Sequence, residues 1–213
     1  LSDTFYWHDY ETSGADPTLD RPWQFAGVRT NTELEIIEEP LTLYSLPTPD
    51  RLPRPAAVRV TGITPQKAEL NGIKEAEFIR RILTEFLKPG TCGIGYNSIR
   101  FDDELTRFTL WRNFRDPYAR EWQNKSSRWD LFNIALAFWA LSPEGIEWPR
   151  KKNGINSFRL ENLTVANGIE HFAAHDALAD VTASIELAKQ FRAANIDLFN
   201  TLHKMRFKRA LMS

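Results

Sequence analysis

The chain has 213 residues, of which 42% are hydrophobic, enough to bury the core of one large domain or two small ones. A formal charge of −1 and a pI of about 6.5 argue against a globally basic protein, so any phosphate-binding surface must be local. The single cysteine excludes an internal disulfide framework and suits a reducing cytoplasm. No apolar run approaches the roughly 20 residues of a membrane span, and no signal peptide is visible.

The first part of the chain is predicted to form strands. Aromatic and β-branched residues indicate strands at 4–10, at 25–30 and, as one segment, at 35–38 with 41–44. A proline-rich loop follows at 47–55. Thr64 and Pro65 have the pattern of an N-cap followed by proline at the first helical position, which predicts the start of a short helix.

Helical patterns dominate the rest. Apolar residues at helical spacing predict helices at 75–87, 103–114, 131–141, 160–167 and 176–191, with a buried strand at 91–96. Three antiparallel-looking strands followed by a helix, a strand and several helices predict an α/β domain with a mixed central sheet flanked by helices. This domain is expected to occupy residues 1–195, and the basic segment 196–213 is expected to begin a linker to C-terminal regions beyond this chain.

Four acidic residues and one histidine form the candidate site. Asp9 and Glu11 are two residues apart on the first predicted strand, so they project from the same face. Asp102 follows the strand at 91–96, and a parallel central strand would place it beside the first. Asp180 is expected to face inward from the second turn of the last helix. His175, in the loop before that helix, could then reach a water bound to a metal.

Each of these residues also has an ordinary structural interpretation. An Asp-x-Glu pair often lies on a solvated strand face, and Asp102 could be an N-cap or a first-turn acid stabilised by the helix dipole. A lone histidine is more often a surface or capping residue than a base. Together, however, the carboxylates would repel one another unless a cation lay between them, and hard oxygen ligands suit Mg²⁺ or Mn²⁺. The combination favours a site that holds two divalent metals and hydrolyses a phosphodiester.

The motifs around these residues carry a resemblance to a known family. They are HDYET at 8–12, NSIRFDDE at 97–104 and HDALAD at 175–180, with further stretches LDRP at 19–22, VTGITP at 60–65, SRWDL at 127–131, SFRLE at 157–161 and ANGIEH at 166–171. The chain resembles the DEDDh 3′→5′ exonucleases and, more narrowly, the exonuclease domain of the bacterial exodeoxyribonuclease I family. The resemblance covers nearly the whole chain.

This resemblance implies a ribonuclease-H-like exonuclease fold that hydrolyses single-stranded DNA from its 3′ end to 5′-mononucleotides, in DNA repair and recombination. It implies two Mg²⁺ ions per site, with Mn²⁺ able to substitute, bound by Asp9, Glu11, Asp102 and Asp180, with His175 as the general base. Members of the family are longer, with an SH3-like region and a helical region that help enclose the strand. They also bind the tail of single-stranded DNA-binding protein, which is therefore a candidate partner of an expected monomer.

A basic and aromatic stretch at 105–129 predicts sequence-tolerant binding of a single strand. Within it, Phe108 and Trp111 are expected in a helix core, whereas Tyr118 and Trp122 are candidates for base stacking. Arg107, Arg128 and Arg159 are the candidate phosphate contacts, and the resemblance implies that Arg159 contacts the terminal nucleotide. Asp130 and Glu161 are expected to be structural. The complete set of candidate substrate-binding residues is Glu11, Thr12, Arg107, Tyr118, Trp122, Arg128, Phe158 and Arg159.

Other functions remain compatible with the acidic residues. An oligoribonuclease or a proofreading-type exonuclease of the same superfamily would share the chemistry, and a non-catalytic single-strand-binding module could share the fold. A structural domain of a larger replication assembly is compatible with catalysis. All five site residues are present, which favours an enzyme, and the long local matches with the basic-aromatic stretch favour the enzyme acting on single-stranded DNA.

Overall fold

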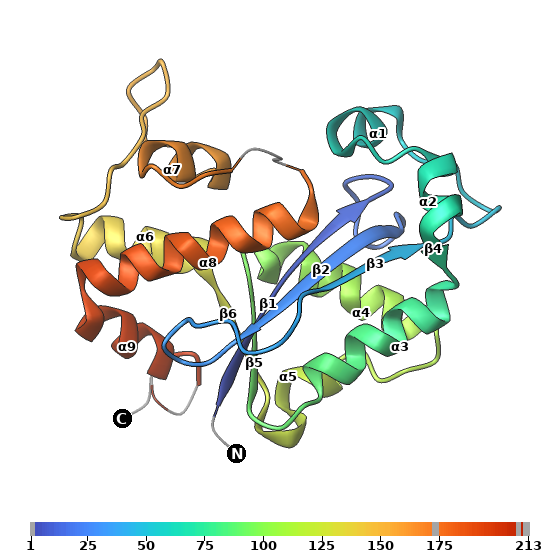
Figure 1. The fold of residues 1–213 in the computed structure, drawn as a ribbon, viewed down its shortest axis with the longest axis horizontal. Coiled ribbons are helices and arrows are strands. Elements are labelled where there is room, and N and C mark those ends of the chain that lie inside the picture. The colour runs from blue at the N-terminus through green and yellow to red at the C-terminus, as the bar shows by residue number, and fades with distance from the viewer. Residues whose placement is uncertain (1–2, 172–174, 208–209, 211–213) are drawn as a thin grey trace.

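A six-stranded mixed sheet, covered by helices on both faces, forms the centre of the molecule (Figure 1). The computed structural model describes residues 3–171, 175–207 and 210. Strand order is β4-β3-β2-β1-β5-β6, with β1 antiparallel to β2 and parallel to β5. The strands are β1 (Thr4–Thr12), β2 (Pro22–Thr30), β3 (Leu41–Ser45), β4 (Gly72–Ile73), β5 (Thr91–Gly95) and β6 (Ser127–Asp130). The expected mixed sheet and the expected parallel pairing of the strand before Asp102 with the first strand are confirmed.

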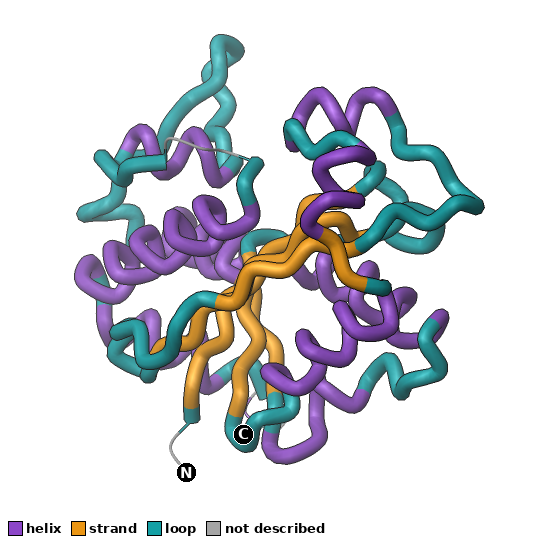
Figure 2. The backbone as a smooth tube through the Cα atoms, turned by 45° about the vertical axis from the view of Figure 1, so that its right-hand side comes forward, coloured by secondary structure: helices purple, strands orange, loops and turns teal. Residues whose placement is uncertain are grey.

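Helices lie on both sides of this sheet (Figure 2). They are α1 (Pro55–Thr61), α2 (Pro65–Asn71), α3 (Glu75–Phe86), α4 (Asp102–Arg112), α5 (Ala119–Trp122), α6 (Leu131–Leu141), α7 (Leu160–Ala166), α8 (Ala177–Ala194) and α9 (Ile196–Lys204), with short 3₁₀ turns η1 (Ser98–Arg100) and η2 (Gln123–Lys125). Within the part of the chain that the structure describes, no helix combines the length and hydropathy needed to cross a bilayer.

The two faces of β1 contribute to two different cores, because successive side chains of a strand point to opposite faces. Phe5 and Trp7 pack in a core with residues of α6, α8 and α9. Tyr6 and Tyr10 pack in a second core with α3 and α4. Asp9 and Glu11 have the same parity as Phe5 and Trp7, so they continue the face of β1 that α8 covers.

Most long helices lie where apolar periodicity predicts them, but several short elements differ. The proline-rich segment 47–55 ends in α1, which has Pro55 in its first turn and a left-handed Gly62 as its C-cap. Since α1 has no buried residue, it has no apolar stripe to detect. The strand expected at 35–38 is wrong, apart from an isolated bridge between Thr30 and Ile36, because Ile36 and Ile37 are exposed and have no core face to cover. By contrast, Thr64 caps α2 as expected.

The C-terminal helix α9 packs on the main core. Its Phe199 is buried, and the ring lies 5.1 Å from that of Trp129, centroid to centroid. The segment expected to begin a linker at residue 196 therefore starts as a helix in contact with the exonuclease-like fold. How the chain divides beyond residue 195 stays a prediction.

Candidate active site

The carboxyl end of β1 supplies two of the acidic side chains. Asp9 is half-buried and Glu11 is 7% exposed. Because β1 is held by β2 on one side and by β5 on the other, both side chains project from a rigid central strand. The ladder with β2 shifts register between Glu11 and Thr12, where the strand leaves the sheet.

Asp102 reaches the same end of the sheet through a tight turn after β5. Asn97 adopts a left-handed conformation with φ of 59°, and Asp130 accepts hydrogen bonds from the backbone N–H groups of Asn97 (2.9 Å) and Ile99 (3.1 Å). Asp130 also caps α6, so its expected structural role is confirmed. Asp102 is then the buried first residue of α4. The N-cap position belongs to Phe101, so Asp102 does not serve as an N-cap.

The N-terminus of α8 brings in the last acidic residue. Asp176 caps the helix by accepting hydrogen bonds from Leu178 and Ala179, and its other oxygen accepts one from buried Gln24 of β2, at 3.0 Å. This clamp fixes the start of α8 against the sheet. Asp180 lies in the first turn and not in the second, because the helix begins at Ala177, one residue later than predicted.

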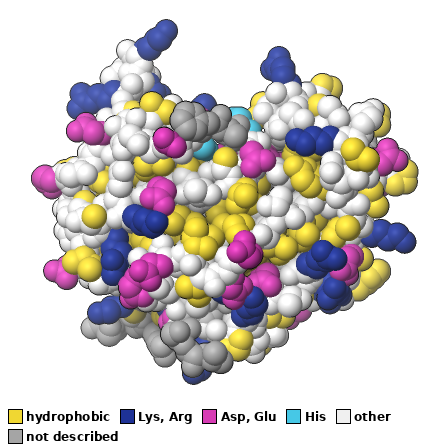
Figure 3. Space-filling model, in the orientation of Figure 1, with side chains coloured by type: hydrophobic (Ala, Val, Ile, Leu, Met, Phe, Trp, Pro, Cys, Tyr) yellow, Lys and Arg dark blue, Asp and Glu magenta, His cyan; other side chains and the backbone are white. Residues whose placement is uncertain are grey.

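His175 lies in the turn before α8, exposed and with a positive φ of 70°. Side-chain ligand atoms of Glu11, His175 and Asp180 all lie within 4.8 Å of one another. Asp9 and Asp180 line one cavity of about 410 Å³, together with Tyr96, Asn97, Phe132, Phe158, Arg159, Leu160 and Glu161. Residues far apart in the sequence thus meet at the upper end of the sheet, where Figure 3 shows histidine side chains at the bottom of the hollow between two projections.

Burial raises the pKa of all four carboxyl groups, and repulsion from other members of the cluster adds to this for Asp9 and Glu11. Burial raises the pKa of Asp9 well above its ordinary value, and the charges of Asp102, Asp180 and Glu11 add to that effect. Burial, with Asp180 and Asp102, raises the pKa of Glu11 to about 8. Burial also raises the pKa of Asp102 and of Asp180. Such mutual repulsion is relieved by a cation, and oxygen ligands with one imidazole fit a divalent metal.

His171 makes a contact with this cluster that the sequence did not indicate. Its side chain is buried, with Nε2 2.5 Å from Asp180 Oδ1 and Nδ1 3.2 Å from Thr164 Oγ1. The imidazole thereby connects α7 to the first turn of α8. A lone histidine nine residues before an aspartate has no periodic relation to it, so no local signal could have revealed the pair.

Besides Glu11, three of the candidate substrate-binding residues lie at the acidic cluster. Phe158 and Arg159 line the cavity of Asp9 and Asp180, and the Arg159 side chain is 73% exposed, with Glu161 at 3.6 Å. Thr12 lines a neighbouring cavity of about 330 Å³ beside Glu11, between β1 and α1. The candidates surround the acids on two sides.

The basic-aromatic stretch has a different environment. Arg107 pairs with Glu104 and Glu121, and Arg128 pairs with Asp103 at 2.8 Å and with Glu121 at 3.2 Å. The Arg107 guanidinium lies over the ring of exposed Tyr118. Exposed Trp122 lines a cavity of about 1050 Å³ with Arg128, among residues that include none of the four acids.

The expectation that Trp111 lies in a helix core is wrong. Trp111 is 68% exposed, because the buried face of α4 is made by Leu105, Thr109 and Leu110. Phe108, on the same helix, is half-buried. A nearly even distribution of apolar residues around α4 made its inner face hard to assign from the sequence.

Comparison with known proteins identifies the family. Residues 6–188 match the family model described as Exonuclease. The chain belongs to this exonuclease family. It is 53% identical to Exodeoxyribonuclease I of Escherichia coli over 210 residues, which are 99% of this chain and 44% of that protein, and 50% identical to Exodeoxyribonuclease I of Haemophilus influenzae over 98% of this chain and 44% of that protein.

Solved structures agree with the exonuclease assignment. Crystal structures of E. coli Exonuclease I in complex with a dA16 oligonucleotide, and of its zinc-bound complex with single-stranded DNA, match with TM-scores of 0.97 and 0.96 at 53% identity, each covering 99% of this chain and 45% of that one. A complex of exonuclease I with SSB-Ct matches with a TM-score of 0.96 at 52% identity, covering 100% of this chain and 46% of that one. The chain has the ribonuclease-H-like exonuclease fold and spans less than half the length of these relatives.

Proposed function

We propose that this chain is a metal-dependent 3′→5′ exonuclease domain that hydrolyses single-stranded DNA to 5′-mononucleotides in DNA repair and recombination. The observation that carries the proposal is the convergence of Asp9, Glu11, Asp102, Asp180 and His175 at one end of the sheet. The relatives named Exodeoxyribonuclease I, and the structures of E. coli Exonuclease I with a dA16 oligonucleotide and with single-stranded DNA, support the choice of substrate.

The four carboxylates would hold the metal, which we propose to be two Mg²⁺ ions, with Mn²⁺ able to substitute. When bound, such ions lower the pKa of an attacking water and stabilise charge on the leaving oxygen. His175 is exposed on a turn at the edge of the cluster, so it can accept a proton from that water and pass it to solvent. Asp9 and Glu11 project from a central strand that is paired on both sides, so the metal that they would hold has a fixed position relative to the sheet.

Arg159 and Phe158 would position the end of the strand. The Arg159 guanidinium is exposed in the cavity of Asp9 and Asp180 and offers donors that fit a phosphate group. Phe158 offers a ring to the terminal base or sugar from the same cavity. Single-stranded DNA-binding protein is the proposed protein partner, supported by the SSB-Ct complex of exonuclease I, and the chain is proposed to act as a monomer.

A labelled oligonucleotide tests this function. A 5′-labelled single-stranded DNA would be incubated with the protein and Mg²⁺, beside an EDTA control, an Asp180→Ala control and a matched RNA strand. The expected result is a metal-dependent ladder that shortens from the 3′ end of DNA and is absent with the variant. Shortening of RNA alone would move the function to the oligoribonuclease branch, and binding without cleavage would indicate a binding module.

A further inference from the structure

A second cavity opens beside the candidate active site. It has a volume of about 360 Å³ and is lined by Trp139, Arg150, Gly154, Ile155, Asn156 and Phe158. Phe158 also lines the cavity that holds Asp9 and Asp180. The two cavities therefore share one aromatic side chain and are neighbours on the surface.

The second cavity has an exposed apolar wall. Trp139, near the end of α6, is 45% exposed, and its ring centroid lies 5.6 Å from that of Phe158 in an edge-to-face arrangement. Ile155, on the loop opposite, is also exposed. The core face of α6 is formed by Leu131, Ile134, Ala135 and Phe138, so packing of that helix does not require Trp139. The ring is available to a partner with a flat apolar face.

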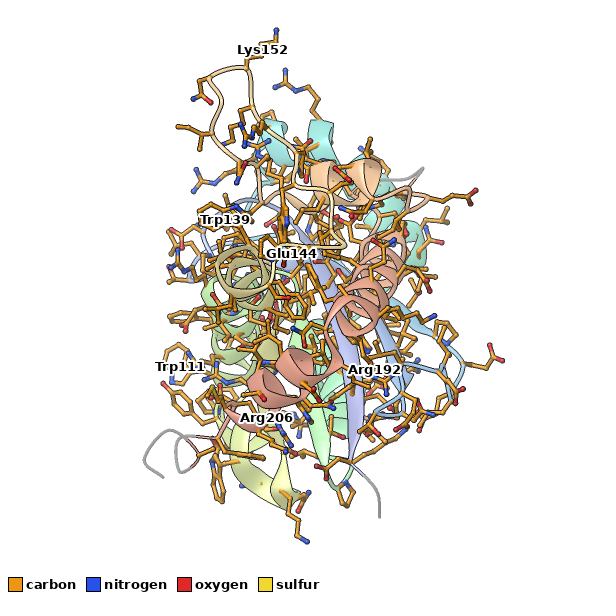
Figure 4. The ribbon with its side chains drawn as sticks, turned by 90° about the vertical axis from the view of Figure 1, so that its left-hand side faces the viewer. Trp111, Trp139, Glu144, Lys152, Arg192 and Arg206 are labelled. Carbon is orange, nitrogen blue, oxygen red and sulfur yellow. The ribbon has the colours of Figure 1, made fainter. Side chains whose placement is uncertain are left out.

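A basic loop closes the other side of the cavity. An isolated bridge between Arg150 and Asn156 shapes the loop, and Gly154 turns it with φ of 80°. Arg150, Lys151 and Lys152 are exposed, and residues 149–157 contain no acidic side chain. Figure 4 shows Lys152 at the far tip of this projection, above Trp139. Within the described ranges, none of these three cations forms an ion pair, unlike Arg107 and Arg128.

We propose that this surface, formed by Trp139, Phe158, Ile155 and Arg150 and called here the Trp139 groove, binds the part of a single-stranded DNA substrate that lies 5′ to the reacting nucleotide. The proposal rests on the proposed function, since it takes the 3′ end to lie at the acids. Bases stack on Trp139 and Phe158, and Arg150 contacts a phosphate. Aromatic rings interleaved with unpaired cations are the chemistry of sequence-tolerant single-strand binding.

Binding and cross-linking test the groove. The variants Trp139→Ala and Arg150→Glu would be titrated against a fluorescent dT oligomer by anisotropy in EDTA, so that no cleavage interferes. Loss of one stacking ring is expected to weaken binding roughly 5- to 100-fold. Matched controls are Trp111→Ala, an exposed tryptophan on α4, and Arg192→Glu, a charge reversal that Figure 4 places on the opposite side from Trp139.

A second readout locates the strand. Oligomers with 5-iodouracil at single positions would be irradiated, and the cross-linked peptides identified by mass spectrometry. Cross-links to Trp139 from nucleotides just 5′ of the terminal one support the groove. Wild-type affinity of both Trp139→Ala and Arg150→Glu overturns it, as does weakened binding by Trp111→Ala alone, which would place the strand along α4. A further outcome is that the wild-type protein does not cleave DNA while the groove variants bind DNA more weakly. That result would reject the proposed function but would support the Trp139 groove as a DNA-binding surface.

Discussion

At the scale of single residues, four carboxyl groups concentrate negative charge in a small volume at the end of β1. The pKa of each is raised first by burial, and for Asp9 and Glu11 next by the neighbouring acids. Asp103, next to Asp102, differs: burial would raise its pKa, but Arg120 and other charges outweigh burial and lower the pKa to about 2. The positive charges of Arg120 and its neighbours thus balance the charge of Asp103, whereas Asp102 is available to a cation.

Substitution of His175 and of a carboxylate should have unequal effects. His175→Ala is expected to lower the turnover rate by about 10²–10⁴-fold and to leave measurable activity, because a general base contributes that much. Asp180→Ala should reduce cleavage to background, since it removes a metal ligand. Initial rates on a labelled oligomer at saturating Mg²⁺ would measure both. A full rate for His175→Ala would reject the assignment of the base.

His171 should affect metal binding through Asp180. Its imidazole forms a hydrogen bond with one carboxylate oxygen of Asp180. Loss of a hydrogen bond to a metal ligand typically weakens metal binding by about 10–100-fold. We expect His171→Ala to show that loss in a Mn²⁺ titration followed by electron paramagnetic resonance, with partial recovery in His171→Gln, which retains a donor. The remote variant His203→Gln serves as control, and equal Mn²⁺ affinity in all three would contradict the role of His171.

At the scale of elements, the start of α4 is anchored by an ionic cluster beneath the site. The Arg120 side chain of α5 is fully buried and donates to Asp103 at 2.5 Å, and Arg128 of β6 donates to the other Asp103 oxygen. Buried His8 of β1 lies 3.9 Å from Asp103. Three elements are thus tied to the first turn of α4, which fixes Asp102 relative to β1.

Removal of one charged partner from this ionic cluster should lower the stability of the fold. Arg120→Met is expected to lower the free energy of unfolding by about 3–5 kcal/mol, because it removes the fully buried countercharge of Asp103 and leaves Arg128, which is partly exposed, as the remaining arginine partner. Chemical denaturation would measure the loss. The double variant Arg120→Met with Asp103→Asn should recover part of it, since the buried charge is then removed. Wild-type stability of Arg120→Met alone would show that the pair does not anchor α4.

Local sequence patterns predicted those elements that have a buried face of their own. Long helices such as α3 and α6 carry an apolar stripe, and the strand parity of Asp9 and Glu11 follows from their spacing. By contrast, α1 has no fully buried residue and β6 has only four residues. The ion pairs that Arg107 and Arg128 form with Glu121 were not predictable, because Glu121 lies on a separate short helix whose position depends on the tertiary fold.

At the scale of the whole molecule, the acidic cluster makes stability depend on pH and on metal. The folded-state pKa of Glu11 is about 8, above its ordinary value of 4.5. Folding therefore keeps a proton that the unfolded chain releases, so the metal-free protein loses stability as pH rises from about 4.5 to 8. His8, whose pKa burial and Arg120 lower to about 4, contributes the opposite slope below about pH 6.5. Between pH 6.5 and 8, Glu11 is the one of these two groups whose titration changes the free energy of unfolding.

Thermal melting should reveal this linkage. In EDTA, the melting temperature is expected to fall from pH 6.5 to 8, and Glu11→Gln should flatten that slope and stabilise the metal-free protein by about 1–3 kcal/mol at pH 8. Mg²⁺ should restore the wild type and have less effect on the variant. Metal affinity should rise through pH 8 with release of protons, seen by calorimetry in two buffers. A parallel slope for wild type and Glu11→Gln would contradict the assignment.

The clamp between β2 and the start of α8 has a consequence for synthesis of the protein. Asp9 and Glu11 lie on the first strand, whereas His175 and Asp180 enter with α8, near the end of the fold. A ribosome adds about 5–20 residues per second, so many seconds separate the emergence of the two halves of the site. Until α8 docks on Gln24, the nascent chain has only part of the acidic site, because Asp180 is not yet in place. The site is therefore completed late in synthesis of this domain, when α8 has emerged and docked on the sheet.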